Sequence, residues 1–268
     1  MIPAYHRPAS VAEALRLKSE LGAGAVFLAG GTEVNNLHSP RPAALIDLAD
    51  LGLATMEFSP QGLRIGAGVT FQQLVEHPET PWFLKAAANQ MTNRNIRNRA
   101  TIGGQIGANR SCADLIPMLL AAEARVTCAD QELPIEKVLG GDPGLILSVF
   151  VPSTSRGFGL GNQTRTASDI SIVNVAVSVA LDGERLRQPI VALGGVAPHV
   201  VRLAAVESTL NGHPLPSKDQ VEALLARAVN PIDDHRGSAA YKRHIAAVLG
   251  ERALRASVRQ LLSGEGVD

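Results

Sequence analysis

"RNRATIGGQIGANRSCADL", residues 97–115, is the stretch that decides the fold. It contains two adjacent glycines, Gly103 and Gly104, and an isolated acid, Asp114, just before an apolar run. Glycine permits backbone angles that are closed to other residues, and it lets another group contact the main chain. The stretch therefore raises a definite question, namely which group lies beside these glycines that a side chain would exclude.

A second glycine pair occurs in "LAGGTEVNN", residues 28–36, directly after a short apolar run. Successive backbone N–H groups in such a turn form a concave anion site, which can hold a phosphate without Lys or Arg. Neutral hydrogen bonds are available from Thr32, Asn35, Thr101 and Gln105. Either pair alone is also typical of a tight turn without a ligand. Two pairs in neighbouring units favour a pyrophosphate held between them.

The dinucleotide fingerprint G-x-G-x-x-G is missing from both glycine segments and from "GAGVTFQ" at residues 66–72, which argues against a Rossmann fold. The two cysteines, Cys112 and Cys128, cannot complete a zinc or iron–sulfur site. Motifs for hydrolytic or zinc-dependent catalysis are also missing. We therefore predict no catalytic residue and no metal ligand in this chain, and we expect any chemistry to come from a bound cofactor.

Composition excludes several further classes of function. The 268 residues are 46% hydrophobic and carry 25 basic and 25 acidic side chains, so the net charge is zero. A neutral chain has no broad footprint for nucleic acid. The first ten residues do not resemble a signal peptide, and the apolar run at residues 172–181 is too short to cross a bilayer. We expect a soluble, cytoplasmic protein.

Periodicity and turn residues predict three regions. Strand and helix signals alternate over residues 1–79, which predicts an α/β subdomain. Residues 80–158 form a second subdomain, with a helix over 82–90 and another over 112–124 that has Asp114 in its first turn. The glycine-rich segment 156–166 is interpreted as a mobile loop and a boundary. In residues 159–268, two neighbouring strands precede three helices, the first over 200–210, which predicts a separate α+β domain.

Five sequence blocks occur in a characteristic order: "LAGGTEV", "ATIGGQIGAN", "SDISIVNVAVSVAL", "ALGGVAP" and "DDHRGSAAYKRHIAAVL". With these blocks the chain resembles the FAD-binding subunit of the molybdenum hydroxylases, a family that includes xanthine dehydrogenase, aldehyde oxidoreductases and the medium subunit of carbon monoxide dehydrogenase. The resemblance implies an α+β protein. A two-subdomain FAD-binding region of the vanillyl-alcohol-oxidase type would be followed by a C-terminal α+β domain, a small antiparallel sheet with helices.

The resemblance also implies which residues bind FAD. The first glycine loop would wrap the pyrophosphate with Phe27, Leu28, Ala29, Gly30, Gly31, Thr32, Glu33 and Val34. The second loop would contact the pyrophosphate and the ribityl chain with Thr101, Gly103, Gly104 and Gln105. Asp114 would form a hydrogen bond near the ribityl or adenosine part, although without the resemblance a helix-start carboxylate is the simpler interpretation. Leu147 would lie by the flavin or the adenine.

In such a complex, a molybdopterin-binding large subunit oxidises the substrate and a small subunit carries two [2Fe-2S] clusters. The resemblance implies that electrons pass from these clusters through FAD to NAD+, a quinone or oxygen. The alternative is an FAD-poor scaffold subunit of the same complex. It is favoured by Gln105, where relatives often have Asn, and by Gln163 and Arg165 in the region before Asp169, where relatives often have Lys.

Overall fold

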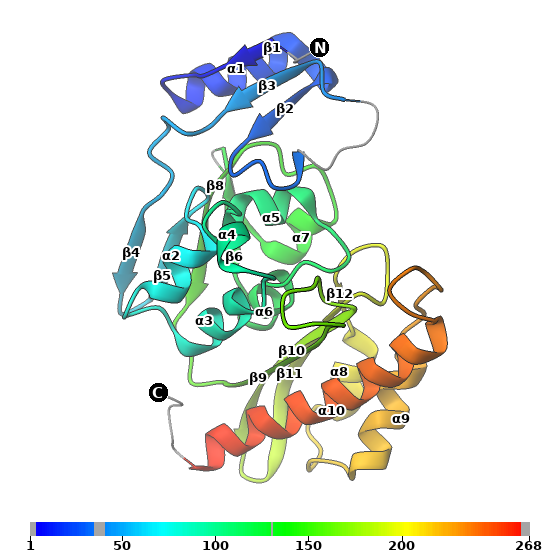
Figure 1. Ribbon diagram of the computed structural model, residues 1–268. Helices are drawn as coiled ribbons and strands as arrows, with labels where there is room; N and C mark the ends of the chain where they lie inside the picture. Colours follow the sequence, from blue (N-terminus) through cyan, green and yellow to red (C-terminus); the bar gives the residue numbers. More distant parts are fainter. Residues whose placement is uncertain (1–3, 35–40, 130, 264–268) are drawn as a thin grey trace.

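The computed structural model describes residues 4–34, 41–129 and 131–263, and these residues form three sheets with their helices (Figure 1). A small sheet with α1 lies at one end of the molecule, a five-stranded sheet lies in the middle, and a four-stranded sheet with the long helix α10 lies at the other end (Figure 1). The architecture is therefore the mixed α+β arrangement predicted from the sequence. Asn35, named above as a hydrogen-bonding residue of the first glycine loop, lies outside the described residues.

The first sheet is parallel, with strand order β1-β3-β2. Its strands are β1 (Ala4–His6), β2 (Ala25–Leu28) and β3 (Ala44–Asp47), and its helices are α1 (Val11–Leu21) and the 3-10 turn η1 (Gly22–Gly24). Helix α1 begins where the Ser10 hydroxyl accepts a hydrogen bond from the Glu13 amide at 3.2 Å, an N-cap that the sequence "SVAE" predicts. The sheet ends at the first glycine loop, which follows β2 directly.

The second sheet is antiparallel, with order β4-β5-β8-β6-β7. Its strands are β4 (Met56–Ser59), β5 (Gly62–Gly66), β6 (Arg125–Cys128), β7 (Gln131–Pro134) and β8 (Ile146–Pro152). Its helices are α2 (Phe71–Glu76), α3 (Trp82–Asn89), α4 (Arg94–Arg97), α5 (Ile102–Ala108), α6 (Ile116–Ala121) and α7 (Ile135–Leu139). Strands β4 and β5 belong to the second sheet, because β5 pairs with β8. The division between the first and second sheets therefore lies between β3 and β4, and the boundary expected at residue 79 falls inside the unit built on the second sheet.

The third sheet is antiparallel, with order β12-β11-β10-β9. Its strands are β9 (Gly157–Gln163), β10 (Val173–Asp182), β11 (Arg185–Gly194) and β12 (Val201–Arg202), and its helices are α8 (Ala204–Leu210), α9 (Lys218–Ala228) and α10 (Ala239–Ser263). The helix expected over residues 200–210 was placed too early, because Val201 and Arg202 pair with β11 before α8 begins.

The prediction of a mobile loop over residues 156–166 was wrong. Residues 157–163 form β9, which pairs with β10 along its whole length. An added Cβ at Gly157 would lie 2.0 Å from the Ser257 carbonyl oxygen, and one at Gly159 would lie 1.9 Å from that of Ala253. The glycines therefore let α10 lie directly on the strand, as the crossing of α10 over this sheet shows (Figure 1).

The helix expected over residues 112–124 is also shorter than predicted. Helix α6 begins at Ile116, so Asp114 lies in the bend that precedes it and is not in its first turn. Pro117 is tolerated only in the first turn of a helix, which sets the start of α6. This position leaves the carboxyl group of Asp114 free to serve a purpose other than capping.

Candidate functional site

The group beside Gly103 is another part of the chain. An added Cβ at Gly103 would lie 2.6 Å from the Cβ of Ala67, and one at Gly104 would lie 2.8 Å from the hydroxyl oxygen of Thr101. Thr101 is the N-cap of α5, and its hydroxyl accepts a hydrogen bond from the Gly104 amide at 3.1 Å. The glycines of the second loop thus allow α5 to start against the connection between β5 and α2.

The amides of this second loop are already used within the protein. The Ile102 amide donates to the Val69 carbonyl at 3.0 Å, and the Gly103 amide donates to the Ala67 carbonyl at 2.9 Å. A helix N-terminus binds anions through amides that have no other acceptor. The argument from free amides, which treated both loops alike, therefore does not hold for the second loop.

The first glycine loop has a different arrangement. Gly30 lies against the main chain of Arg99, since an added Cβ would be only 1.7 Å from the Arg99 carbonyl oxygen. The Arg99 Nε donates to the Gly30 carbonyl at 3.3 Å. Gly31 has a φ of 73°, which favours glycine. Within the described residues, the amides of Gly30 and Gly31 have no hydrogen-bond acceptor, so they remain donors for an anion.

The two loops are brought together along α5. Gly30 contacts the chain just before α5 begins, whereas Glu33 is paired with Arg110 just after it ends. The Arg110 Nε donates to the Glu33 Oε1 at 2.7 Å. Since α5 has seven residues, it is about 10 Å long. The first loop therefore follows the length of α5 and offers an extended site, as a long dinucleotide requires.

Asp114 supplies a buried acceptor beyond the end of α5. Its exposed fraction is 8%, and the Ser171 hydroxyl donates to its Oδ1 at 3.1 Å. Burial raises the pKa of Asp114 to about 6, although the hydrogen bonds from Ser171 and from its own amide act in the opposite direction. A carboxylate that has lost its water is a favourable partner for further donors, and the hydroxyl groups of a ribityl or ribose chain are such donors.

Gln105 and Leu147 hold the neighbouring parts in place. The Gln105 Oε1 accepts a hydrogen bond from the Leu115 amide at 2.9 Å, so this side chain spans α5 and the segment that carries Asp114. Leu147 is half-buried in β8 and packs against the core of the first sheet, and its carbonyl accepts from the Ala67 amide at 2.9 Å. Both residues therefore lie where the units of the site meet.

The third sheet fixes the Asp114 segment from the other side. The Asn174 side-chain amide donates to the Ala113 carbonyl at 2.8 Å, and the Gly195 amide donates to the Ser111 carbonyl at 2.8 Å. A guanidinium N–H of Arg236 donates to the Cys112 sulfur, and burial raises the pKa of that thiol. The "SDISIVNVAVSVAL" and "ALGGVAP" blocks thus hold the backbone of this segment, and the "DDHRGSAAYKRHIAAVL" block contacts its Cys112 side chain.

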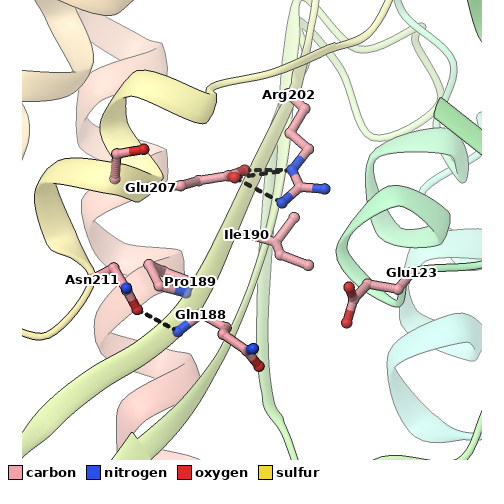
Figure 2. A pocket seen from close by; sticks show the side chains of 8 residues that line it. Glu123, Gln188, Pro189, Ile190, Arg202, Glu207 and Asn211 are labelled. Carbon is pink, nitrogen blue, oxygen red and sulfur yellow. Dashed lines mark hydrogen bonds and ion pairs between the residues drawn. The ribbon is translucent and has the colours of Figure 1, made fainter.

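A separate hollow of about 280 Å³ lies between α6 and the β11–α8 unit (Figure 2). Its walls are formed by Glu123, Gln188, Pro189, Ile190, Arg202, Glu207, Ser208 and Asn211. The hollow is below the range of about 300–1,000 Å³ that is usual for drug-sized ligands, and FAD is larger than these. It is therefore not the flavin site.

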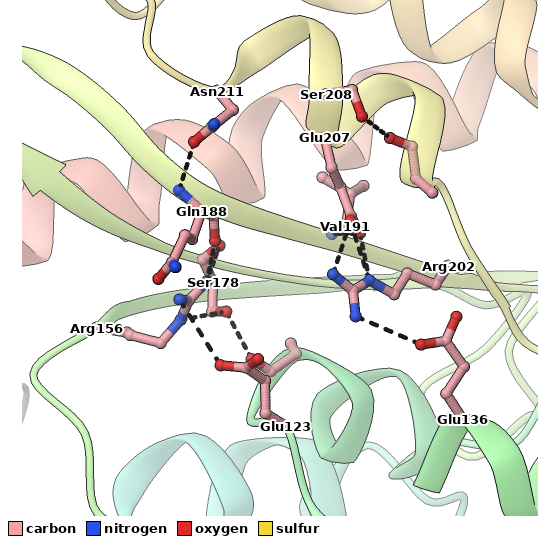
Figure 3. A network of polar contacts seen from close by, with 12 residues as sticks. Glu123, Glu136, Arg156, Ser178, Gln188, Val191, Arg202, Glu207, Ser208 and Asn211 are labelled. Atoms are coloured by element: carbon pink, nitrogen blue, oxygen red, sulfur yellow. Dashed lines mark hydrogen bonds and ion pairs between the residues drawn. The ribbon is translucent and has the colours of Figure 1, made fainter. Parts of the chain in front are cut away.

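The charges around this hollow are paired with one another (Figure 3). Arg202 and the buried Glu207 form an ion pair at 2.9 Å, and Arg202 also contacts Glu136 at 3.4 Å. The buried Arg156 donates through Nε to the Ser178 hydroxyl at 3.0 Å. The contact of Arg202 with Glu136 joins the third sheet to α7 and thus links the two halves of the chain.

Sequence reasoning did not identify Arg110 as part of the site. A single arginine in a polar turn gives no signal of its own, and its partner Glu33 is 77 residues away. Among the described residues, no group of three or more His, Cys, Asp or Glu side chains is arranged to hold a metal ion. The described helices include none that is both long and apolar enough to cross a membrane.

Comparison with known proteins gives consistent results along the chain. Residues 2–154 match the family described as "FAD binding domain in molybdopterin dehydrogenase", and residues 162–257 match "CO dehydrogenase flavoprotein C-terminal domain". The protein YgfM of Escherichia coli (strain K12), described as uncharacterized, is 34% identical over 93% of this chain and 94% of its own. The nicotine 6-hydroxylase medium subunit of Paenarthrobacter nicotinovorans is 29% identical over 93% of this chain and 95% of its own.

Among solved structures, carbon monoxide dehydrogenase from Hydrogenophaga pseudoflava that lacks the Mo-pyranopterin moiety contains a similar chain. The TM-score is 0.88 at 28% identity, covering 97% of this chain and 99% of the other. The fold and the family matches thus define a flavoprotein of the oxidoreductase class. More specifically, the chain belongs to the family of FAD-binding medium subunits of molybdenum hydroxylases, and FAD is its cofactor.

Proposed function

We propose that this chain is the electron-transfer subunit of a cytoplasmic molybdenum hydroxylase complex. A molybdopterin-binding large subunit would oxidise the substrate, and a small subunit with [2Fe-2S] clusters would pass the electrons on. FAD in this chain would accept them and deliver them to NAD+, a quinone or oxygen. The observation that carries the proposal is the pair of glycine loops aligned along α5, with a buried acceptor, Asp114, beyond its end.

The residues present fit the parts of FAD. The amides of Gly30 and Gly31 are donors for the pyrophosphate, and the positive side chain of Arg99 lies nearby. Asp114 is an acceptor for hydroxyl groups, and Leu147 is an apolar surface for a ring. The remaining residues of the first loop, from Phe27 to Val34, would surround the dinucleotide, and those of the second loop, from Thr101 to Gln105, would form the surface behind it.

Within this division of labour, the protein binds and orients the cofactor and the flavin supplies the redox chemistry when it is bound. The buried Asp114 would fix the sugar chain, because a hydrogen bond to a desolvated carboxylate is stronger than one in water. The first loop would fix the diphosphate. We assign no proton transfer to any side chain of this subunit.

The direct test is to purify the chain and to measure its flavin content. A yellow protein with absorbance near 450 nm, roughly the usual flavin band, that exchanges FAD but does not bind FMN would support the proposal, since FMN lacks the diphosphate bridge. Co-purified partners should contain molybdenum and iron. A colourless chain that FAD cannot reconstitute would refute FAD binding.

That second outcome would favour the alternative, an FAD-poor scaffold subunit. One observation supports this alternative: the amides of Ile102 and Gly103 donate to carbonyls within the chain, so they are not available to bind a phosphate. The scaffold would still assemble with its partners, so co-purification without flavin is its expected signature.

A further inference from the structure

Glu33, a residue of the first glycine loop, forms an ion pair with Arg110, and the binding of a phosphate group does not by itself require such a pair. Glu33 is the seventh residue of the first glycine loop, counted from Phe27, and its side chain carries a carboxyl group. A carboxylate close to a pyrophosphate repels it unless a cation lies nearby. The guanidinium of Arg110 supplies that cation, through Nε at 2.7 Å and through a second N–H, both on the same carboxylate oxygen.

The pair also connects two units of the fold. Glu33 follows β2 of the first sheet, and Arg110 follows α5 of the second unit. At the opposite end of α5, the described contacts of the loop include the close approach of Gly30 to the Arg99 backbone and the Arg99 hydrogen bond at 3.3 Å. Without the ion pair, the Glu33 end of the loop would lose its described side-chain link to α5.

We infer that the Glu33–Arg110 ion pair holds the first glycine loop against α5 and thereby slows the release of FAD. This inference rests on the proposed function, and it assigns to Arg110 a positioning role through Glu33, not a contact with the cofactor. Both side chains are partly exposed, at 61% for Arg110 and 37% for Glu33. Exposed ion pairs have small effects and are weakened by salt, so the expected change is about two- to fivefold in the release rate.

The test is a double-mutant cycle on the full chain. Variants Glu33→Gln, Arg110→Gln and the double variant are loaded with radiolabelled FAD and chased with excess unlabelled FAD. Each single variant should release FAD about two- to fivefold faster than the wild type, and the double variant should be no faster than either single variant. High salt should accelerate release from the wild type only.

A matched control is the Arg7–Asp50 ion pair, which also joins residues far apart in the sequence and has both side chains 50% exposed. This pair lies at the first sheet and does not involve α5. Asp50→Asn should leave the release rate unchanged. Additive effects in the double variant would overturn the inference. So would slower release from Glu33→Gln, because it would show that Arg110 contacts the phosphates directly and that Glu33 only competes with them.

A second measurement separates this inference from the proposed function. Hydrogen exchange of residues 28–34 in flavin-free protein reports the loop without any cofactor. Both single variants should increase exchange there by about the same two- to fivefold factor, even if the wild type proves to bind no FAD. If the wild type binds FAD but residues 28–34 exchange no faster in the variants than in the wild type, the ion-pair role is refuted and the proposed function remains intact.

Discussion

Replacement of Asp114 by Asn should raise the stability of the flavin-free protein and lower its affinity for FAD. The carboxyl group is buried, and among the described residues its side-chain partner is the Ser171 hydroxyl, which an amide oxygen can also accept from. Asn is nearly isosteric with Asp and has no ionised form. The exchange therefore removes the charge and keeps the shape, so that the effect of the charge is measured almost alone.

The magnitude follows from the shift in pKa. The pKa of Asp114 rises from 3.8 to about 6 in the folded chain, and each unit corresponds to 1.36 kcal/mol, so ionisation costs at most about 3 kcal/mol of stability. The folded state holds the proton more tightly than the unfolded state. The contribution of Asp114 to stability is therefore most favourable below pH 4, declines as the pH rises from about 4 to about 6, and reaches its full cost above that window.

Flavin-free Asp114→Asn protein should thus be more stable than the wild type by up to about 3 kcal/mol at pH 7.5, with the gap closing toward pH 4. Urea unfolding across this pH range measures the difference. The control is Asp169→Asn, because Arg165 donates a hydrogen bond to that exposed carboxyl and lowers its pKa, so its removal should not stabilise the protein. A destabilised Asp114→Asn variant, or a gap that does not change with pH, would refute the reasoning.

The same variant should bind FAD about 10- to 100-fold more weakly at pH 7.5, since a hydrogen bond to a charged group contributes roughly 1.5–3 kcal/mol. Wild-type affinity should fall as the pH drops through about 6, because protonation removes the charged acceptor. The variant should show no such dependence near this pH. Equal affinity of wild type and variant would mean that Asp114 does not contact the cofactor.

Three further substitutions test the packing described above. Gly159→Ala should lower the free energy of unfolding by about 3 kcal/mol, because the new Cβ would lie 1.9 Å from the Ala253 carbonyl, and thermal unfolding would show it. Arg202→Leu should cost about 3 kcal/mol in urea unfolding, since it leaves the buried Glu207 without its cation, whereas an unchanged midpoint would show that the pair is dispensable. Gln105→Leu should lower the free energy of unfolding by about 1–3 kcal/mol and speed FAD release, because the buried Leu115 amide loses its acceptor. Gln105→Glu keeps an acceptor oxygen, so its stability and its FAD release rate should stay close to those of the wild type.

Local patterns predicted the long elements and failed where a distant contact decides the structure. Helix α10 and strands β10 and β11 were visible because their periodicity is carried by many residues. Strand β9 was interpreted as a loop, since glycine normally weakens a strand. Its glycines make sense only with α10 in place, about one hundred residues further along the chain, and no local window contains that information.

The candidate site shows the same limit, because a local sequence pattern does not reveal contacts with distant residues. The sequence identified the two glycine loops and Asp114, because bare backbone and an isolated acid are local signals. It could not show that the missing side chains at Gly30 and Gly103 make room for neighbouring parts of the protein, Arg99 and Ala67, and not for a ligand. The close approach of Gly30 to the Arg99 backbone is what brings the two loops together.

A division of roles between the loops follows from that packing. The second loop donates its amides to Val69 and Ala67, so it builds the wall against which the first loop rests. Among the residues that the structure describes, the amides of Gly30 and Gly31 have no acceptor, and the first loop contacts an arginine side chain at each end of α5. Affinity for the diphosphate should therefore depend on the geometry of the first loop. Substitutions in the second loop should act mainly through its stability, because its donors are already committed to the fold.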